Sequence, residues 1–398
     1  MCEIESWSFQ TKLLHNSQKI DHTSGAVSVP IQHASTFHQY DIDAFGKYDY
    51  SRSLNPTREA LETVIADMEE GTRGFAFSSG MAAISTAFLL LSKGDHVVIT
   101  EDVYGGTYRF VTEVLSRYGI EHTFVDMTDL DDVKQAIRPS TKVFYVESPS
   151  NPLLKVTDIK AISSIAKSHG ALTFVDNTFL TPALQKPLTL GADVVLHSAT
   201  KFLSGHSDVV AGLTVVKDPI LADKIGFLQN SFGAVLGVQD AWLVLRGIKT
   251  LHVRLAQSIQ SAKQIAQALK EIPAIKNVYY PGLEDHPHYV LQGKQAKGAG
   301  AVLSFELASE SILRDFVSNV KIPVFAVSLG AVESILSYPA KMSHAAMPDH
   351  EREKRGISNS LLRLSVGLEN TEDLLKDFKT ALTANSHKEK AFHRGGWQ

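Results

Sequence analysis

The sequence contains a single cysteine, Cys2, which excludes an internal disulfide and a zinc site built from several thiolates, and which is typical of a reducing compartment. It also lacks a long apolar run. Residues 82–91 form the longest strongly apolar stretch, which is too short to cross a bilayer. Residues 1–6 contain no basic segment followed by an apolar one, so we expect no secretory signal. These absences predict a cytoplasmic protein without a membrane partner.

An excess of charge is also absent. The 398 residues carry a formal net charge of -4, and 21% of them are charged. Non-specific binding to nucleic acid depends on a basic surface, so the composition argues against a nucleic-acid partner. The apolar share of 44% is that of an ordinary globular protein, and a chain of this length predicts two domains.

Apolar and β-branched runs alternate with helical patterns over much of the chain. The runs cover residues 74–78, 96–100, 122–126, 142–147, 171–176, 193–196 and 212–216. The helical patterns cover residues 83–91, 108–118 and 159–168. This alternation is typical of βαβ units, and it predicts an α/β fold with a largely parallel sheet covered on both faces. In such a sheet, ligands bind outside the carboxyl ends of the strands.

The two ends of the chain depart from this pattern. Residues 1–56 have weak periodicity, and we interpret them as an arm that lies on a second subunit. A helix is then predicted from Thr57, as N-cap, to Gly71. Another long helical region, over 234–269, leads to further strands at 301–306, 324–328 and 361–366. The predicted parts are the arm at 1–56, a large domain at 57–250, and a small domain at 251–398 with a frayed tail over 385–398.

A lysine lies a short distance after one of the apolar runs. Lys201 comes five residues after the run 193–196. A lysine beside a buried strand is unfavourable unless its charge is paired or removed. A covalent bond to an aldehyde would remove the charge, and the hydroxyls of Ser198 and Thr200 could bind a phosphate nearby. Pyridoxal phosphate (PLP) carries both groups. The other interpretation is a surface lysine at the end of a strand.

Further strand ends carry groups that suit the same cofactor. Gly80 and Met81 begin a helix, whose free N–H groups attract an anion, although an ordinary helix cap has a similar sequence. Asp176 could pair with a protonated ring nitrogen, or it could cap the next helix through Thr178. Tyr104 could stack on the cofactor, or loop packing could hold it. Because these residues follow different strands of one sheet, we expect them to meet in one crevice.

Arg363 lies within the apolar strand predicted at 361–366. An arginine in this setting favours bidentate binding of an amino-acid carboxylate, or else a structural salt bridge. The 16 histidines lack carboxylate or thiolate partners at a recognisable zinc-site spacing, so we expect no metal. The sequence also lacks a GxGxxG motif after the first strand and a Walker lysine. A dinucleotide-binding or non-catalytic α/β protein is therefore the more distant alternative.

Eight short motifs resemble, in order and spacing, those of the trans-sulfuration (Cys/Met metabolism) PLP-dependent enzymes of fold type I. They are YSR at 50–52, SGM at 79–81, DVYGGT at 102–107, ESPSNP at 147–152, VDNT at 175–178, SATK at 198–201, SLG at 328–330 and RLSVG at 363–367. The resemblance covers essentially the whole chain. It implies the aspartate aminotransferase-like fold, with a large domain built on a mostly parallel sheet and a smaller C-terminal α/β domain.

The resemblance also implies roles for individual residues. Lys201 would hold PLP covalently, Asp176 would pair with the pyridine nitrogen, and Tyr104 would stack on the ring. The phosphate would be bound by Gly80, Met81, Ser198 and Thr200 of one subunit, with Tyr50 and Arg52 arriving from its neighbour. The substrate carboxylate would be held by Asn151, Ser328 and Arg363, while Asp49 would reach a distal ammonium. Members of the family are typically homotetramers built from two such dimers.

Within this family, the sequence is most similar to the bacterial cystathionine β-lyases. The resemblance therefore implies β-elimination of L-cystathionine to homocysteine, pyruvate and ammonia in methionine biosynthesis. Cystathionine γ-lyase or γ-synthase chemistry in the same site is the alternative, and Glu333 matches those enzymes as well. Gly106 stands where methionine γ-lyases usually have a reactive cysteine, which argues against that activity. Leu54 departs from the family's more usual glycine.

Overall fold

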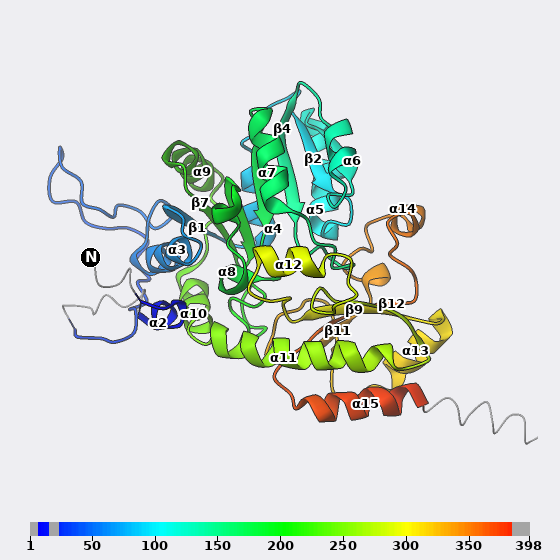
Figure 1. Cartoon of the computed structure of the whole chain (residues 1–398). Helices are drawn as coiled ribbons and strands as arrows, with labels where there is room; N and C mark the ends of the chain where they lie inside the picture. The colour runs from blue at the N-terminus through cyan, green and yellow to red at the C-terminus, as the bar shows by residue number, and fades with distance from the viewer. Residues whose placement is uncertain (1–6, 16–23, 384–398) are drawn as a thin grey trace, which may run out of the picture.

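The computed structural model describes residues 7–15 and 24–383. Its framework consists of two β-sheets, of which the larger lies in the upper part of Figure 1 and the smaller in the lower part. The larger sheet has seven strands in the order β1-β7-β6-β5-β4-β2-β3. Their bounds are β1 Arg73–Phe77, β2 His96–Thr100, β3 Glu121–Val125, β4 Thr141–Glu147, β5 Leu172–Asp176, β6 Val194–Ser198 and β7 Gly212–Val216.

The larger sheet is mostly parallel, as predicted. Strand β7 runs antiparallel to both of its neighbours, β1 and β6, and every other neighbouring pair is parallel. Each of the seven predicted runs forms one of these strands, with ends shifted by no more than two residues. The carboxyl ends of β1, β2, β4, β5 and β6 consequently meet at one edge of the sheet.

Helices cover both faces of the larger sheet, which explains why its strands are apolar throughout. On β4, for example, Phe144 and Tyr145 are both fully buried but belong to separate core clusters on opposite faces. One face is covered by α4, α5 and α9, and the other by α3, α6, α7 and α10. Their bounds are α3 Pro56–Met68, α4 Gly80–Phe88, α5 Gly105–Arg109, α6 Leu130–Gln135, α7 Ile159–Ser168, α9 Pro219–Phe232 and α10 Val238–Ile248. Two short segments, α8 Thr181–Leu184 and the 3-10 turn η3 Pro187–Leu190, connect β5 to β6.

The start of α3 corrects the predicted cap. Asn55, and not Thr57, is the N-cap, because its side-chain oxygen accepts a hydrogen bond from the Thr57 N–H at 2.9 Å. The Thr57 hydroxyl instead donates to the carbonyl oxygen of Pro30 at 2.8 Å. Pro56 then occupies the first helical position, where its missing N–H is not needed. The helix ends at Met68, before the predicted Gly71.

Two predicted helices are divided in the structure. The segment predicted at 108–118 consists of α5, a π-helical turn η1 at Phe110–Val114 and a 3-10 turn η2 at Leu115–Tyr118. The long helical region is α10 followed by α11, Leu251–Lys270. At that junction, Arg254 of α11 donates to the Gly247 carbonyl oxygen near the end of α10 at 2.8 Å. Apolar periodicity continues through both helices, so the sequence pattern did not reveal the break.

The smaller sheet has five strands in the order β10-β11-β12-β9-β8, and all neighbouring pairs except β10 and β11 are antiparallel. Their bounds are β8 Ile275–Tyr279, β9 Val302–Leu307, β10 Val324–Phe325, β11 Ile335–Ser337 and β12 Leu361–Ser365. Helices α11, α13 Glu310–Asn319 and α15 Thr371–Thr383 pack against it. The remaining short elements are α12 Tyr289–Gln295, the 3-10 turn η4 Pro339–Lys341 and α14 Asp349–Lys354.

The strands of the small sheet were predicted less completely. The runs at 301–306 and 361–366 form β9 and β12, whereas only the first two residues of the run 324–328 are in a strand, β10. The prediction missed β8, which is an edge strand with exposed polar residues, and β11, which has three residues. The strands of the two sheets lie on either side of residue 250 in the sequence. The division into 57–250 and 251–398 stays a prediction.

The described part of the N-terminal segment lies outside both sheets. Helix α2, Phe9–His15, contacts α3 through the buried Leu13. Residues 24–54 contain neither helix nor strand, apart from one bridge between Thr36 and Tyr50. Val29 packs against the core, while another part of this segment extends away from the body of the molecule (Figure 1). The tail predicted at 385–398 lies outside the described residues. Over the part of the chain that the structure describes, no helix is both long and apolar enough to span a membrane.

Candidate active site

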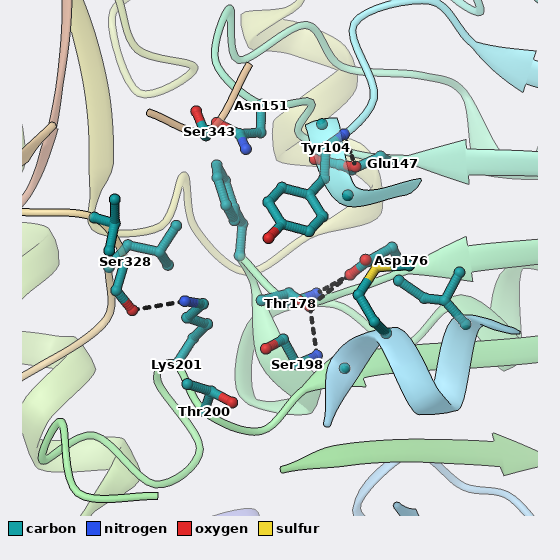
Figure 2. Close-up of a pocket in the computed structure, with 18 of the residues that line it drawn as sticks. Tyr104, Glu147, Asn151, Asp176, Thr178, Ser198, Thr200, Lys201, Ser328 and Ser343 are labelled. Atoms are coloured by element: carbon teal, nitrogen blue, oxygen red, sulfur yellow. Dashed lines mark hydrogen bonds between the residues drawn. The ribbon is translucent and has the colours of Figure 1, made fainter. Parts of the chain in front are cut away.

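A cavity of about 570 Å³ lies at the carboxyl ends of the parallel strands, where the two sheets face each other. Residues that follow β1, β2, β5 and β6 line it together with the last residue of β4, and the smaller domain supplies residues 327–329, Met342, Ser343, Ala345, Ala346 and Arg363. The predicted meeting of several strand ends in one crevice is therefore observed. Lys201 and Asp176 line the same cavity, as the prediction required (Figure 2).

Lys201 is held at the edge of this cavity by a residue of the smaller domain. Its Nζ donates a hydrogen bond to the Ser328 hydroxyl at 2.6 Å, and Figure 2 shows this contact. Burial, assisted by the positive charge of Arg363, lowers the pKa of Lys201 to about 8. A larger fraction of this amine is therefore neutral near pH 7 than of an exposed lysine, and the neutral form is the nucleophile.

Asp176 ends β5 and is almost fully buried. Its Oδ1 accepts hydrogen bonds from the Thr178 N–H at 3.0 Å and from the Thr178 hydroxyl at 2.5 Å. The alternative role of Asp176, a local turn with Thr178, is thus present. Asp176 also lines the cavity, so the two roles are compatible. Burial raises the pKa of Asp176, whereas these hydrogen bonds act to lower it. A cationic partner inside the cavity would stabilise its charged form.

The beginning of α4 presents a surface that suits an anion. Ser79 caps the helix by accepting a hydrogen bond from the Ala82 N–H at 3.0 Å, and the N–H groups of the first helical turn have no partner within the helix. A Cβ atom at Gly80 would lie 2.9 Å from the Ser198 Cβ, so glycine permits the helix to approach β6. Ser198 lies beside this helix start, on the cavity wall.

Thr200 also lines the cavity, but its hydroxyl group already has backbone partners. It donates to the Ala211 carbonyl oxygen at 3.2 Å and accepts from the Ala211 N–H at 3.0 Å. The predicted contact of Thr200 with a phosphate would therefore replace or share one of these hydrogen bonds.

Tyr104 follows β2, and its side chain points into the cavity in Figure 2. A Cβ atom at Gly106 would lie 2.4 Å from the Tyr104 Cε1, which shows that the ring passes directly over this glycine. A side chain at position 106 would therefore displace the ring. The Tyr104 N–H donates to the Glu147 carboxylate at 2.9 Å, and this contact fixes the backbone that carries the ring.

Arg363 reaches the cavity from β12 and is only 2% exposed. Its guanidinium group donates to Asn151 Oδ1 at 2.8 Å and to the Ser328 carbonyl oxygen at 2.7 Å. Among the described residues it forms no ion pair, so the salt bridge considered as its alternative role is absent there. Burial lowers the pKa of Arg363 to about 10. A buried cation with neutral partners is suited to binding a carboxylate.

Other predicted residues do not reach the cavity of their own chain. Arg52 donates to the Asn230 carbonyl oxygen at 2.7 Å, and its guanidinium carbon lies 5.5 Å from the centre of the Tyr50 ring. Asp49 accepts a hydrogen bond from the Tyr50 N–H at 2.6 Å. Glu333 is exposed and does not line the cavity of its own chain either.

The sequence reasoning assigned no role to several residues that line the cavity. Glu147 ends β4 beside Asp176, and burial together with the Asp176 carboxylate raises its pKa well above the usual range. Its position at the end of an apolar strand could have marked it, as it marked Asp176. The cavity residues Val327, Met342, Ser343, Ala345 and Ala346 had no such signal, because they lie in irregular segments of the smaller domain.

The described residues fit PLP. An amine with a lowered pKa, a buried carboxyl group and the start of a helix surround one cavity, and an aromatic ring projects into it. These groups match the aldehyde, the ring nitrogen, the phosphate and the flat face of that cofactor. The described residues contain no cluster of ligands that could hold a metal ion.

Comparison with known proteins agrees with this chemistry. The family model described as Cys/Met metabolism PLP-dependent enzyme matches residues 10–383. A cystathionine beta-lyase of Bacillus subtilis (strain 168) is 66% identical over 377 residues, which cover 95% of this chain and 97% of that protein. A cystathionine gamma-lyase of the same strain is 51% identical over 373 residues, which cover 94% of this chain and 98% of that protein.

Solved structures share the whole fold. The crystal structure of a cystathionine gamma-lyase from Lactobacillus plantarum complexed with L-serine has a TM-score of 0.93 and 47% identity, covering 95% of this chain and 99% of that one. That of a cystathionine gamma synthase from Xanthomonas oryzae pv. oryzae in complex with cystathionine has a TM-score of 0.94 and 41% identity, covering 96% and 99%. The fold, the cavity and these similarities together show that the chain belongs to the family of Cys/Met metabolism PLP-dependent enzymes.

Proposed function

We propose that this protein is a cystathionine β-lyase that cleaves L-cystathionine into homocysteine, pyruvate and ammonia. The observation that carries the proposal is that Lys201, with its lowered pKa, shares one cavity with Asp176 and Arg363. The 66% identity to a cystathionine beta-lyase supports the β reaction. By the same similarity, we place the reaction in methionine biosynthesis.

The residues of the cavity would hold PLP at three points. Lys201 would bind its aldehyde carbon, Asp176 its ring nitrogen, and the start of α4 with Ser198 and Thr200 its phosphate. Tyr104 would lie against the flat face of its ring. When bound, PLP withdraws electrons from the Cα atom of an amino acid and so makes the Cα proton acidic.

Lys201 would transfer the protons of the reaction. Its neutral amine would take the proton from the Cα atom, and the ammonium form would return a proton to the departing thiolate of homocysteine. A pKa of about 8 suits both steps, because the two forms of the amine coexist near neutral pH. The Tyr104 hydroxyl is the alternative donor of this one proton to the sulfur.

The substrate carboxylate would bind to Arg363, Asn151 and Ser328. The guanidinium group of Arg363 and the side chain of Asn151 already contact each other at 2.8 Å, so they would present a prearranged pair of donors. The Ser328 hydroxyl accepts a hydrogen bond from Lys201 at 2.6 Å, which places the amine beside this carboxylate site. Such an arrangement would bring the Cα proton towards Lys201.

A second copy of the chain would complete the site. Tyr50, Arg52 and Asp49 lie on the extended N-terminal segment and do not reach their own cavity. That segment exposes large apolar side chains, such as Ile42 at 89% and Tyr40 at 88%, which would be covered by a neighbouring subunit. We therefore propose a homotetramer of two active-site-sharing dimers, located in the cytoplasm.

The γ reaction in the same cavity is the second candidate, because a cystathionine gamma-lyase is 51% identical to this chain. Incubation of the purified protein with L-cystathionine and identification of the keto acid distinguishes the two reactions. Pyruvate with homocysteine is the expected result. If 2-oxobutyrate with cysteine were the main products, the protein would be a γ-lyase and the β proposal would be wrong.

A further inference from the structure

The peptide group that joins Val103 to Tyr104 is held at both ends by buried side chains. The Tyr104 N–H donates to Glu147 Oε2 at 2.9 Å. On the other side, the Val103 carbonyl oxygen lies 3.2 Å from Nε2 of His344, which belongs to the smaller domain. Because this C=O and N–H are parts of one planar group, the two contacts together set its orientation. The peptide group is therefore held between side chains of two domains.

His344 is suited to be the donor in this arrangement. It is fully buried, and burial lowers its pKa to about 3, so the imidazole is neutral near pH 7. The Ser343 hydroxyl lies 2.9 Å from Nδ1 and can donate to it. Nε2 is then the nitrogen that carries the hydrogen atom and donates to Val103. Each ring nitrogen thus has a partner.

The packing around this peptide group leaves no space for it to rotate freely. A Cβ atom at Gly105 would lie 2.0 Å from the Ser343 carbonyl oxygen, so the segment before His344 rests directly on the turn after Tyr104. The ring of Tyr104 in turn lies over Gly106, where a Cβ atom would be 2.4 Å from it. A change at His344 would therefore be transmitted to the ring.

The same imidazole lies near the predicted carboxylate site. The backbone of Asn151 lies close enough to His344 to act on its pKa, in the direction that raises it. The side chain of Asn151 accepts a hydrogen bond from Arg363 at 2.8 Å. We propose that His344 and Glu147 are positioning residues that hold the Tyr104 ring over the cofactor.

Two substitutions of His344 distinguish the effect of losing its hydrogen bond from the effect of changing its side-chain volume. His344→Gln keeps a side-chain N–H near the position of Nε2, whereas His344→Leu removes the donor. Each is made in the natural chain and in a Tyr104→Ala background, and the PLP-loaded proteins are compared by visible circular dichroism and by kcat/KM. The comparison of kcat/KM rests on the proposed function, whereas the circular dichroism of bound PLP does not depend on the substrate.

We expect His344→Leu to reduce the visible signal and to lower kcat/KM about ten- to a hundredfold, since small displacements of a catalytic group have effects of this size. His344→Gln should retain both properties within roughly threefold. In the Tyr104→Ala background, His344→Leu should change either property less than roughly threefold, because the residue through which it acts is gone. An equal loss in both backgrounds, or a His344→Gln variant as impaired as His344→Leu, would overturn the proposal.

Two further comparisons distinguish the proposed effect from a general loss of structure. His96 is another fully buried histidine, and it lies at the opposite end of β2, 2.8 Å from the Thr141 hydroxyl. His96→Leu should lower the denaturation midpoint without changing the visible signal. If His344→Leu does not fold, Glu147→Met and Glu147→Gln apply the same test from the other side of the peptide group. A wild-type protein that loads PLP but leaves cystathionine intact would contradict the proposed function alone.

Discussion

The amine of Lys201 should react with aldehydes near neutral pH much faster than the exposed lysines of the chain. Burial and the charge of Arg363 lower its pKa to about 8. Only a neutral amine attacks a carbonyl carbon. At pH 7.5, an amine with this pKa is about one quarter neutral, compared with about one part in a thousand for an ordinary lysine. The difference in reactive fraction is roughly 200-fold.

This difference can be measured on cofactor-free protein. Brief treatment with pyridoxal is followed by borohydride reduction, and peptide mass spectrometry gives the labelled fraction of Lys201 between pH 6 and 10. The peptide with the exposed Lys224 is the internal reference. Because the pKa is lowered, the label should increase with pH and reach half of its maximum near pH 8. Arg363→Met removes a cation that lowers the pKa, so the midpoint should move to higher pH.

Two results would refute this reasoning. The first is a label that does not reach its midpoint by pH 10, as expected for an ordinary lysine with a pKa of about 10.4, which would mean that the amine is fully hydrated in solution. The second is equal labelling of Lys201 and Lys224 at pH 7.5. In either case the cavity would not provide the reactive amine on which the proposed function depends.

Three further substitutions test the site and the core. Asp176→Asn should weaken the binding of PLP roughly ten- to a hundredfold in a fluorescence titration, because a charge-assisted hydrogen bond to the ring nitrogen is lost; unchanged affinity would count against the pairing. Arg363→Met should raise KM for cystathionine by a similar factor, about tenfold or more, and a fall in kcat alone would argue against carboxylate binding. Phe88→Ala should reduce the free energy of unfolding by about 3–5 kcal/mol in urea denaturation, since this fully buried ring stacks on Tyr145 with centroids 5.2 Å apart. A loss below about 1 kcal/mol would show that neighbouring side chains fill the space left by the deleted ring.

Much of the larger sheet could be predicted from the sequence because its signals are local. Strands buried on both faces need continuous apolar runs, and a polar residue directly after such a run lies at the carboxyl edge of the sheet. This pattern predicts that Asp176 and Lys201 share one cavity, as the structure shows. It was weaker for the smaller sheet, where β8 contains two adjacent exposed polar residues, Lys276 and Asn277, and β11 is very short.

Other features depend on partners that no local pattern reveals. The sequence predicts Thr57 as the N-cap of the helix, but its hydroxyl contacts Pro30, and Asn55 is the N-cap. Residues 110–118 have the periodicity of one helix, yet they form turns of different type. In the proposed dimer, the positions of Tyr50, Arg52 and Asp49 relative to a cavity would depend on the second subunit, which neither the sequence pattern nor a single chain describes.

The sequence by itself determined which residues end the strands of the larger sheet, because an apolar run and the polar residue after it are neighbours along the chain. Only the tertiary structure decided how those residues are held. His344 lies 241 residues from the Val103 carbonyl that it contacts, and Arg363 lies 212 residues from Asn151. Such contacts form when two separately folded sheets meet, and their geometry depends on the packing of both domains rather than on any short segment.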